Sequence, residues 1–302
     1  MLRTIQLSMF NLLLQFGIKK DFEIDRDSRL YPELLRQIPN PPKKLFCRGN
    51  PELLDCRKVA VVGSRRYSLY GKQTALMIGK YFGKTELAVV SGLASGIDTF
   101  AHTGVLEAGG STIAVLGTGL DRNYPVKNKP LQEEIAEKGL VISEYENDFS
   151  GNQYSFPARN RIISGLSEGV VVVEAGSSSG SLITAQFAGE QGRTVYAVPG
   201  NINSQFSIGT NLLIRDGAVP LVVVKDVLLD MGLELPEESE KKIALGGDEM
   251  AILEIVKRNN GIHVNEIAHI MNKNIGKISA IITVLEIKGI VISHGGKIHL
   301  AN

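Results

Sequence analysis

The sequence predicts an α/β protein: a Rossmann-like, doubly wound and mostly parallel sheet, followed by a small winged-helix domain. Three observations lead to this prediction. From Val59 onward, short continuous apolar runs alternate with helix-length segments, which is typical of strands covered on both faces. The rhythm stops after Leu233 in a charged segment that contains Pro and Gly. Amphipathic helical patterns and a hairpin pattern then complete the chain.

The N-terminal part, residues 1–40, is predicted to be a short helical and proline-rich extension. Its first segment, MLRTIQLSMFNLLLQFGIKK, is interrupted by polar residues and has no small-residue cleavage site. It is too short and too polar for a membrane span, so we expect an amphipathic helix and a cytoplasmic protein. Residues 31–56 contain five prolines and are expected to lead into the first strong strand.

The Rossmann-like domain is predicted to span residues 41–233. Alternating strands and helices indicate right-handed crossovers and a mostly parallel sheet. The loops at the carboxyl ends of such strands are the usual ligand-binding edge. The predicted strand runs are VAVVG, LAVVSG, TIAVLG, LVISE, GVVVVEA, RTVYAVPG and AVPLVVV.

Composition limits the classes of partner and cofactor. The 302 residues are 43% hydrophobic and 22% charged, and the formal net charge is +1. A site for a polyanion must therefore be a local concentration of Lys and Arg. Cys47 and Cys56 form a single possible pair, which fits a reducing compartment better than a disulfide scaffold. No metal-ligand spacing is present, so we expect no metal and no cofactor.

The C-terminal part divides into a linker, residues 234–247, and a winged-helix domain, residues 248–302. Asp248 is the expected N-cap of the first of three amphipathic helices. GIHVNEIAHIM and GKISAIITVLEIKG resemble a helix-turn-helix pair, and a hairpin is expected to turn at residues 294–296.

The segment VAVVGSRRYS places Gly63, Ser64 and Arg65 directly after the first predicted strand of the Rossmann-like domain. A single glycine does not make the G-x-G-x-x-G dinucleotide motif. Exposed backbone N–H groups, a hydroxyl and guanidinium groups instead favour a phosphate site. The alternative is a salt-bridged surface turn.

The segment SGLASGIDTFAH follows the next strand and places Asp98 and His102 four residues apart on one helix face. They could form an acid–base or metal pair. With no nucleophile beside them, a hydrogen-bonding role that holds the loop is favoured.

The segment VVEAGSSSGSLITAQFA follows another buried strand, and residues 177–181 form a hydroxyl-rich turn that opens a helix. Such a turn suits an anion, but it lacks the Lys of a Walker loop. Glu144 and Glu174 end strands without a spacing that pairs them as general acid and base. Catalytic residues are therefore not predicted.

The segment YSFPARNRII can be interpreted in two ways. Tyr154 and Phe156 could be core residues, with Arg159 and Arg161 on a solvated helix face. Because the segment lies at the expected ligand edge, the arginines could instead surround an exposed ring with the serine turn. Cations that contact phosphates, beside a ring on which a base stacks, are typical of single-stranded nucleic acid binding.

These motifs, together with GLDRNYP and AVPG…GTNLLIRDGA, occur in the order found in the DNA-processing protein family DprA, also called Smf, which the chain resembles from about Tyr31 to Leu233. The resemblance implies a non-enzymatic, homodimeric protein that binds single-stranded DNA, protects incoming strands and helps load the RecA recombinase during natural transformation. It also implies a phosphate turn at residues 63–65 and a stacking ring at Phe156. Gln153 and Ser179 stand where relatives often have basic residues, which implies fewer phosphate contacts.

The candidate residues for binding single-stranded DNA are Gly63, Ser64, Arg65, Phe156, Arg159, Asn160, Arg161, Gly180 and Ser181. The competing hypothesis is a Rossmann-type enzyme or sensor for a small nucleotide. Leu212, Ile214, Leu228 and Leu229 are either a dimer patch or core residues. The winged helix offers few cations, so docking is favoured over DNA binding there.

Overall fold

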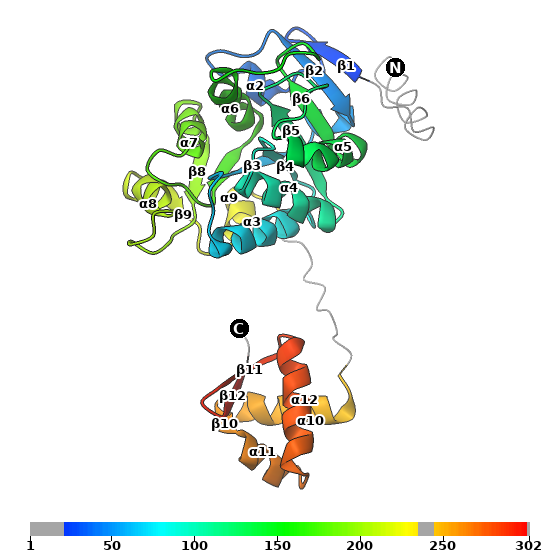
Figure 1. Cartoon of the computed structure of the whole chain (residues 1–302), viewed down its shortest axis with the longest axis vertical. Helices are drawn as coiled ribbons and strands as arrows, with labels where there is room; N and C mark the ends of the chain where they lie inside the picture. The colour runs from blue at the N-terminus through cyan, green and yellow to red at the C-terminus, as the bar shows by residue number, and fades with distance from the viewer. Residues whose placement is uncertain (1–20, 235–244, 301–302) are drawn as a thin grey trace. The chain divides into compact units, whose positions relative to one another are not determined.

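The computed structural model describes residues 21–234 and 245–300, and the chain divides into two compact units, Met1–Pro236 and Glu237–Asn302 (Figure 1). The predicted N-terminal amphipathic helix and most of the predicted linker lie outside the described residues. The predicted domain boundaries stay predictions, because they differ from this division by a few residues and depend partly on those segments.

The first unit is built on a nine-stranded sheet in the order β1-β2-β6-β5-β4-β3-β7-β8-β9. The strands from β6 to β9 in this order are parallel, and β1 and β2 add an antiparallel edge. The strands are β1 (Asp21–Asp25), β2 (Lys44–Gly49), β3 (Lys58–Val62), β4 (Ala88–Ser91), β5 (Ser111–Leu116), β6 (Leu140–Ser143), β7 (Gly169–Val172), β8 (Thr194–Ala197) and β9 (Val219–Pro220).

Helices cover both faces of this sheet, as the predicted doubly wound fold requires (Figure 1). Val59 and Val61 pack with α3, α4 and α9 on one face, while Ala60 and Val62 pack with α2, α6 and α7 on the other. The helices are α2 (Glu33–Arg36), η1 (Pro51–Leu54), α3 (Leu69–Phe82), α4 (Ile97–Glu107), η2 (Val126–Asn128), α5 (Lys129–Lys138), α6 (Ser155–Leu166), α7 (Ser181–Glu190), α8 (Ile208–Arg215) and α9 (Lys225–Asp230).

The direction of strand addition reverses at β3, whose parallel neighbours are β4 on one side and β7 on the other. The chain runs outward from β3 through β4 and β5, then returns to begin β7. The loops that follow β3 and β7 therefore diverge and leave a crevice at their carboxyl ends. This is the point at which open parallel sheets bind ligands.

Two parts of the first unit differ from the expected strand pattern. The proline-rich leader contains a real strand, β2, which pairs with β6, and Ile24, Tyr31 and Leu35 are buried in the core. The predicted strand AVPLVVV was wrong in extent: only Val219–Pro220 pairs with β8, and Val222 is 78% exposed. A run of valines is buried only where another helix or strand packs against it.

The second unit contains α10 (Gly247–Arg258), β10 (Ile262–His263), α11 (Val264–Ile270), α12 (Ile275–Ile287), β11 (Val291–His294) and β12 (Lys297–Leu300). Its strands form an antiparallel sheet in the order β10-β12-β11. Apolar residues from all three helices and all three strands form one core.

The start of α10 differs from the sequence prediction. Asp248 was the wrong N-cap: the N-cap is Gly246, whose N–H donates to the Glu249 carboxylate at 2.7 Å. Asp248 lies in the first helical turn and pairs with Lys273 instead.

Candidate functional site

A cleft of about 1430 Å³ lies at the carboxyl ends of β3 and β7. Four segments that are distant in sequence meet there: the turn after β3, the loop before α6 with the start of that helix, the turn after β7, and the loop before α8. They contribute residues 63–67, 150–153, 156, 157, 159, 160, 176–181, 205, 206 and 208, and Tyr124 joins them from the loop after β5.

The turn after β3 presents two cationic side chains to solvent. Arg65 and Arg66 are both exposed, and neither forms an ion pair with a described residue. The turn itself is fixed, because the Ser64 N–H donates to the Glu174 carbonyl at 2.8 Å and the Arg66 N–H donates to Ser64 Oγ at 3.2 Å. The arrangement offers positive charge on a rigid support, as a phosphate site requires.

The turn after β7 offers uncharged donors on the other side of the cleft. Ser177 and Ser178 are exposed, and the hydroxyls of Ser179 and Ser181 lie 2.8 Å apart at the start of α7. Asn160 Nδ2 donates to the Gly180 carbonyl at 3.1 Å and so ties this turn to α6. The positive end of the α7 dipole and these donors suit an anion.

Phe156 lies between the two turns as a half-buried ring. The backbone of Gly117 packs against it so closely that a Cβ there would lie 2.6 Å from the ring. The Arg65 guanidinium carbon stands 5.8 Å from the ring centroid, and the Tyr124 ring lies 4.8 Å away. Phe156 thus belongs to the cleft surface, and one part of its ring is anchored in the protein.

The two arginines of YSFPARNRII are buried and bonded within the protein, whereas Arg65 is exposed. Arg159 is buried and its Nη1 donates to the carbonyls of Gly92, at 2.6 Å, and Val115. Burial lowers the pKa of Arg159 to about 10, so the guanidinium remains cationic at neutral pH. Arg161 is also buried and pairs with Glu144 at 2.6 Å, outside the lining of the cleft.

Asp98 holds loops, as the favoured interpretation expects, whereas His102 contacts strand β5. The Asp98 carboxylate accepts from the N–H groups of Gly63, Gly92 and Ala94 at 3.2–3.4 Å. Burial raises the pKa of Asp98, against the opposing charge of Arg159. His102 Nδ1 lies 2.6 Å from Thr112 Oγ1, and burial lowers the pKa of His102 to about 3. His102 is therefore neutral, and the geometry supports positioning rather than acid–base chemistry.

Glu174, two residues after β7, is a residue next to the cleft to which sequence reasoning assigned no role. Its carboxylate is buried and accepts from Ser68 N–H at 2.9 Å and Ser68 Oγ–H at 2.5 Å, at the N-terminus of α3. A Cβ at Gly71 would lie 2.0 Å from Glu174 Oε2, so the glycine makes this approach possible. The carboxylate thus occupies the helix end that binds pyrophosphate in dinucleotide-binding folds.

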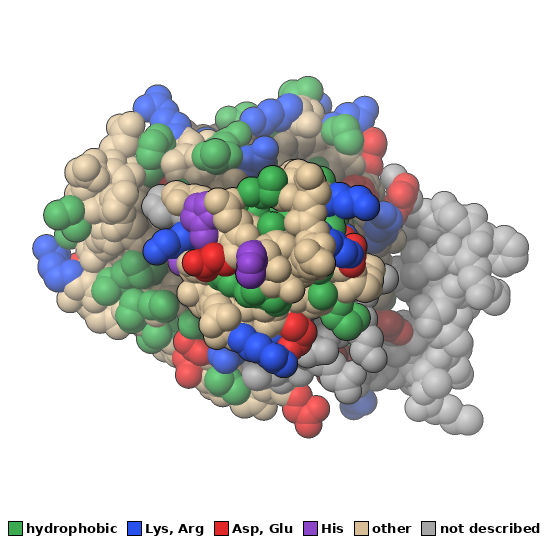
Figure 2. Space-filling model, turned by 90° about the horizontal axis from the view of Figure 1, so that it is seen from below, with side chains coloured by type: hydrophobic (Ala, Val, Ile, Leu, Met, Phe, Trp, Pro, Cys, Tyr) green, Lys and Arg blue, Asp and Glu red, His purple; other side chains and the backbone are tan. Residues whose placement is uncertain are grey.

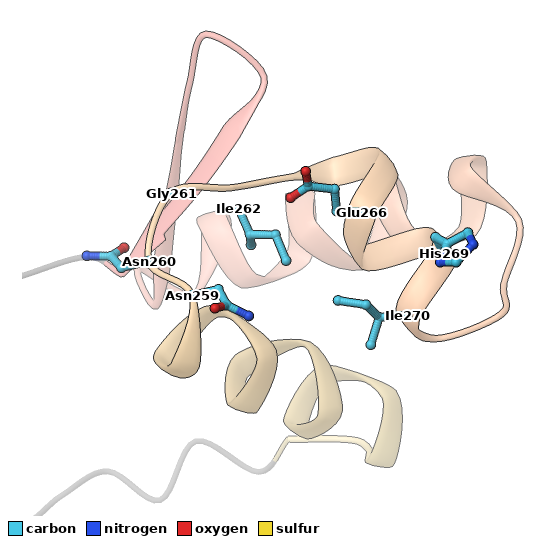
Figure 3. A pocket seen from close by; sticks show the side chains of 7 residues that line it. All are labelled: Asn259, Asn260, Gly261, Ile262, Glu266, His269 and Ile270. Carbon is cyan, nitrogen blue, oxygen red and sulfur yellow. The ribbon is translucent and has the colours of Figure 1, made fainter.

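A smaller cavity of about 600 Å³ lies in the second unit between the end of α10 and α11 (Figure 3). Ile262 and Ile270 point toward it, and Glu266 and His269 lie along its α11 side. Within residues 21–234 and 245–300, no group of three or more His, Cys, Asp or Glu side chains could hold a metal ion. None of the helices described there is long and apolar enough to cross a membrane.

Comparisons with known proteins agree on one family. The family model for DNA recombination-mediator protein A matches residues 23–232. DNA processing protein DprA of Streptococcus pneumoniae is 48% identical over 200 residues, which cover 66% of this chain and 71% of that protein. An X-ray structure of DprA from Streptococcus pneumoniae matches with a TM-score of 0.68 at 46% identity, covering 70% of this chain and 74% of the other.

A second solved structure is DNA processing protein A from Helicobacter pylori, described for its unique single-stranded DNA binding mode. It matches with a TM-score of 0.63 at 33% identity and covers 70% of this chain and 95% of that one.

Proposed function

Because this chain belongs to the DNA recombination-mediator protein A family, we propose that its cleft binds single-stranded DNA. In this proposal the protein protects incoming strands and helps load RecA during natural transformation. The relative from Helicobacter pylori, described for its single-stranded DNA binding mode, supports the choice of ligand.

The observation that carries the proposal is the position of Arg65 beside Phe156. An unpaired guanidinium stands 5.8 Å from the centroid of a half-exposed ring in an open cleft. A strand could place a phosphate at Arg65 and a base on the ring at the same time. Duplex DNA cannot do this, because its bases are already stacked and paired.

The experiment is a titration of labelled oligo-dT, of duplex of the same length and of free nucleotides, each at two salt concentrations. We expect oligo-dT to bind best. With two phosphate contacts, from Arg65 and Arg66, and about 0.7 counterions released per contact, a fourfold rise in salt weakens binding about 7-fold. Equal affinity for duplex, or a flat response to salt, would contradict the proposal.

We propose no catalytic activity. Asp98 and His102 are used by internal hydrogen bonds, and the Glu174 carboxylate contacts Ser68. The cleft, at about 1430 Å³, is also larger than the usual 300–1,000 Å³ of a small-molecule site. These observations favour a polymer over the competing small nucleotide.

We also propose that the first unit forms a homodimer through the surface of α8 and α9. Leu212 and Leu229 are exposed, as are Val222 and Val223 in the segment before α9. Leu228 is fully buried, so its assignment to a dimer patch was wrong, and Ile214 is half-buried. Light scattering at micromolar concentration tests the dimer, and a monomer would contradict it.

For the second unit we propose a winged helix with an auxiliary or docking role. Lys273 pairs with Asp248, and Lys288 pairs with Glu249 at 2.7 Å, so these two lysines are neutralised locally, whereas the exposed Lys277 and Lys297 form no ion pair with a described residue. The face drawn in Figure 2 includes side chains of both units, and Lys and Arg side chains lie there among hydrophobic, acidic and uncharged ones. For the second unit, the pairing of Lys273 and Lys288 with carboxylates favours a protein partner over duplex DNA.

A further inference from the structure

We propose that Tyr124 is a second stacking site for a nucleobase of single-stranded DNA, next to Phe156 in the same cleft. The inference rests on the proposed function and extends it from one aromatic contact to two. Tyr124 comes from the loop between β5 and η2, far from the YSFPARNRII segment in sequence. It nevertheless lines the cleft together with Phe156 and Arg65.

The exposure of the two rings differs in a way that favours Tyr124. Phe156 is half-buried and packs on the backbone of Gly117, whereas Tyr124 is 49% exposed. No described residue forms a hydrogen bond with the Tyr124 hydroxyl. A large, rigid ring with this much free surface is well suited to stacking, because every nucleobase has a π-face.

The geometry of the ring pair determines where bases could lie. The two centroids are 4.8 Å apart and the ring planes meet at 41°. A base inserted between parallel rings needs about 7 Å, twice the 3.4 Å separation of stacked bases. The gap is therefore too small, so a base must lie on the outer surface of either ring. Two bases on these tilted rings would point in different directions, which requires the strand to bend between them.

The loop that carries Tyr124 is fixed on both sides of the ring. Before it, Leu120 is buried and its carbonyl accepts from Gln132 Nε2 at 3.1 Å. After it, the buried Asn128 donates from Nδ2 to the Leu93 carbonyl at 2.9 Å and to Thr99 Oγ1 at 2.8 Å. A ring held this way loses little freedom when a ligand binds, which favours affinity.

Positive charge accompanies the ring. Lys127 and Lys129 lie three and five residues after Tyr124, both are exposed, and neither forms an ion pair with a described residue. Arg65 and Arg66 line the same cleft as the Tyr124 ring. A ring that shares a cleft with these arginines repeats the combination found at Phe156, so the chemistry again selects a nucleic acid strand.

The test uses the absence of tryptophan from the chain, which makes any introduced indole a unique fluorescent reporter. Tyr124→Trp and Phe156→Trp are each titrated with oligo-dT, while anisotropy of a labelled oligonucleotide reports binding to the unchanged protein. Tyr154→Trp is the matched control, because Tyr154 is 74% exposed and lies outside the cleft lining. We expect quenching at positions 124 and 156 and none at 154.

Affinity provides the second measurement. Tyr124→Ala should weaken oligo-dT binding on the order of 5- to 150-fold, the loss of one stacked base, while Tyr124→Phe keeps the ring and the affinity. Melting curves of the same variants report folding. If the unchanged protein binds oligo-dT and Tyr124→Trp is not quenched, the second stacking site is refuted and the proposed function stands. If the unchanged protein does not bind oligo-dT, both the proposed function and the second stacking site are refuted.

Discussion

The arginines at the rim of the cleft and two lysines of the second unit, Lys273 and Lys288, use their positive charge in opposite ways. At the rim, Arg65 and Arg66 are exposed and have no acidic partner among the described residues. In the second unit, Lys273 and Lys288 contact Asp248 and Glu249. Equal numbers of cations in a sequence therefore need not give equal attraction for a polyanion. What matters is whether the fold has already neutralised each charge.

The same contrast exists inside the cleft. Arg159 and Arg65 both line it, but Arg159 donates to the carbonyls of Gly92 and Val115, while Arg65 remains free above the Phe156 ring. Arg159 therefore ties the loop after β4 to strand β5, and Arg65 is available for a ligand. Four predictions test this division of roles.

The largest expected effect is on stability, from Arg159→Ala. The substitution leaves two buried carbonyls without a donor and Asp98 without the nearby positive charge, so we expect a loss of about 3 kcal/mol or more in the free energy of unfolding. Chemical denaturation measures it, with Arg65→Ala as the exposed control. An unchanged stability would mean that Arg159 is not structural.

Phe156→Ala should act mainly on binding, with a loss of about 1–3 kcal/mol of affinity for oligo-dT. Because the ring neutralises no phosphate, the dependence of affinity on salt should stay nearly unchanged. If Phe156 were instead a core residue, truncation would cost about 3–5 kcal/mol of folding stability. Thermal melting and oligo-dT titration of the same variant distinguish a binding role from a core role. A large drop in melting temperature would show that the ring belongs to the core.

Arg65→Ala should lower affinity and also flatten the salt dependence by about one phosphate contact, or about 0.7 in the logarithmic slope. The melting temperature should not move, because the side chain is exposed. Titrations of the variant at several salt concentrations give the slope. If the salt slope of the variant equals that of the unchanged protein, Arg65 does not contact a phosphate.

The smallest expected effect is from Lys277→Ala on α12, which carries an exposed lysine in the second unit. We expect less than a twofold change in oligo-dT affinity and no change in the salt slope. A drop comparable to that of Arg65→Ala would break the comparison, because it would show that both units contribute phosphate contacts.

The sequence predicts the parallel strands of the sheet well, because β3 to β7 are almost entirely buried and therefore read as continuous apolar runs. The sequence does not predict β2, because its segment KLFCRG stands between prolines. This segment forms a strand by pairing with β6, which is distant in sequence. The sequence prediction also fails at Val222, where an apolar run is exposed. Pairing and coverage are tertiary properties that local patterns do not contain.

The candidate site shows the same limit. The turn after β3 and the ring of Phe156 meet in one cleft, as the motif order indicated. Residue type alone could not show that Arg159 and Arg161 are bonded inside the protein while Arg65 is exposed. Their roles depend on Gly92, Val115 and Glu144, which lie 17–67 residues away along the chain. Tyr124 lies in GLDRNYP, one of the motifs that carry the family resemblance, but nothing in that segment indicated a ring exposed in the cleft.

The Glu174 carboxylate at the start of α3 has a consequence for competition between ligands. Free nucleotides outnumber DNA ends in any cell, and a single strong phosphate site would be filled by them. Here one helix N-terminus is closed by the protein's own carboxylate, and the remaining donors are spread over separate loops. In the proposed function, a mononucleotide reaches at most the Arg65 turn and the neighbouring Phe156 ring, whereas a polymer also reaches the serine turn and gains the effective concentration of linked contacts. A cleft with several weak contacts, rather than one strong phosphate site, therefore selects its ligand by chain length and not by any single chemical group.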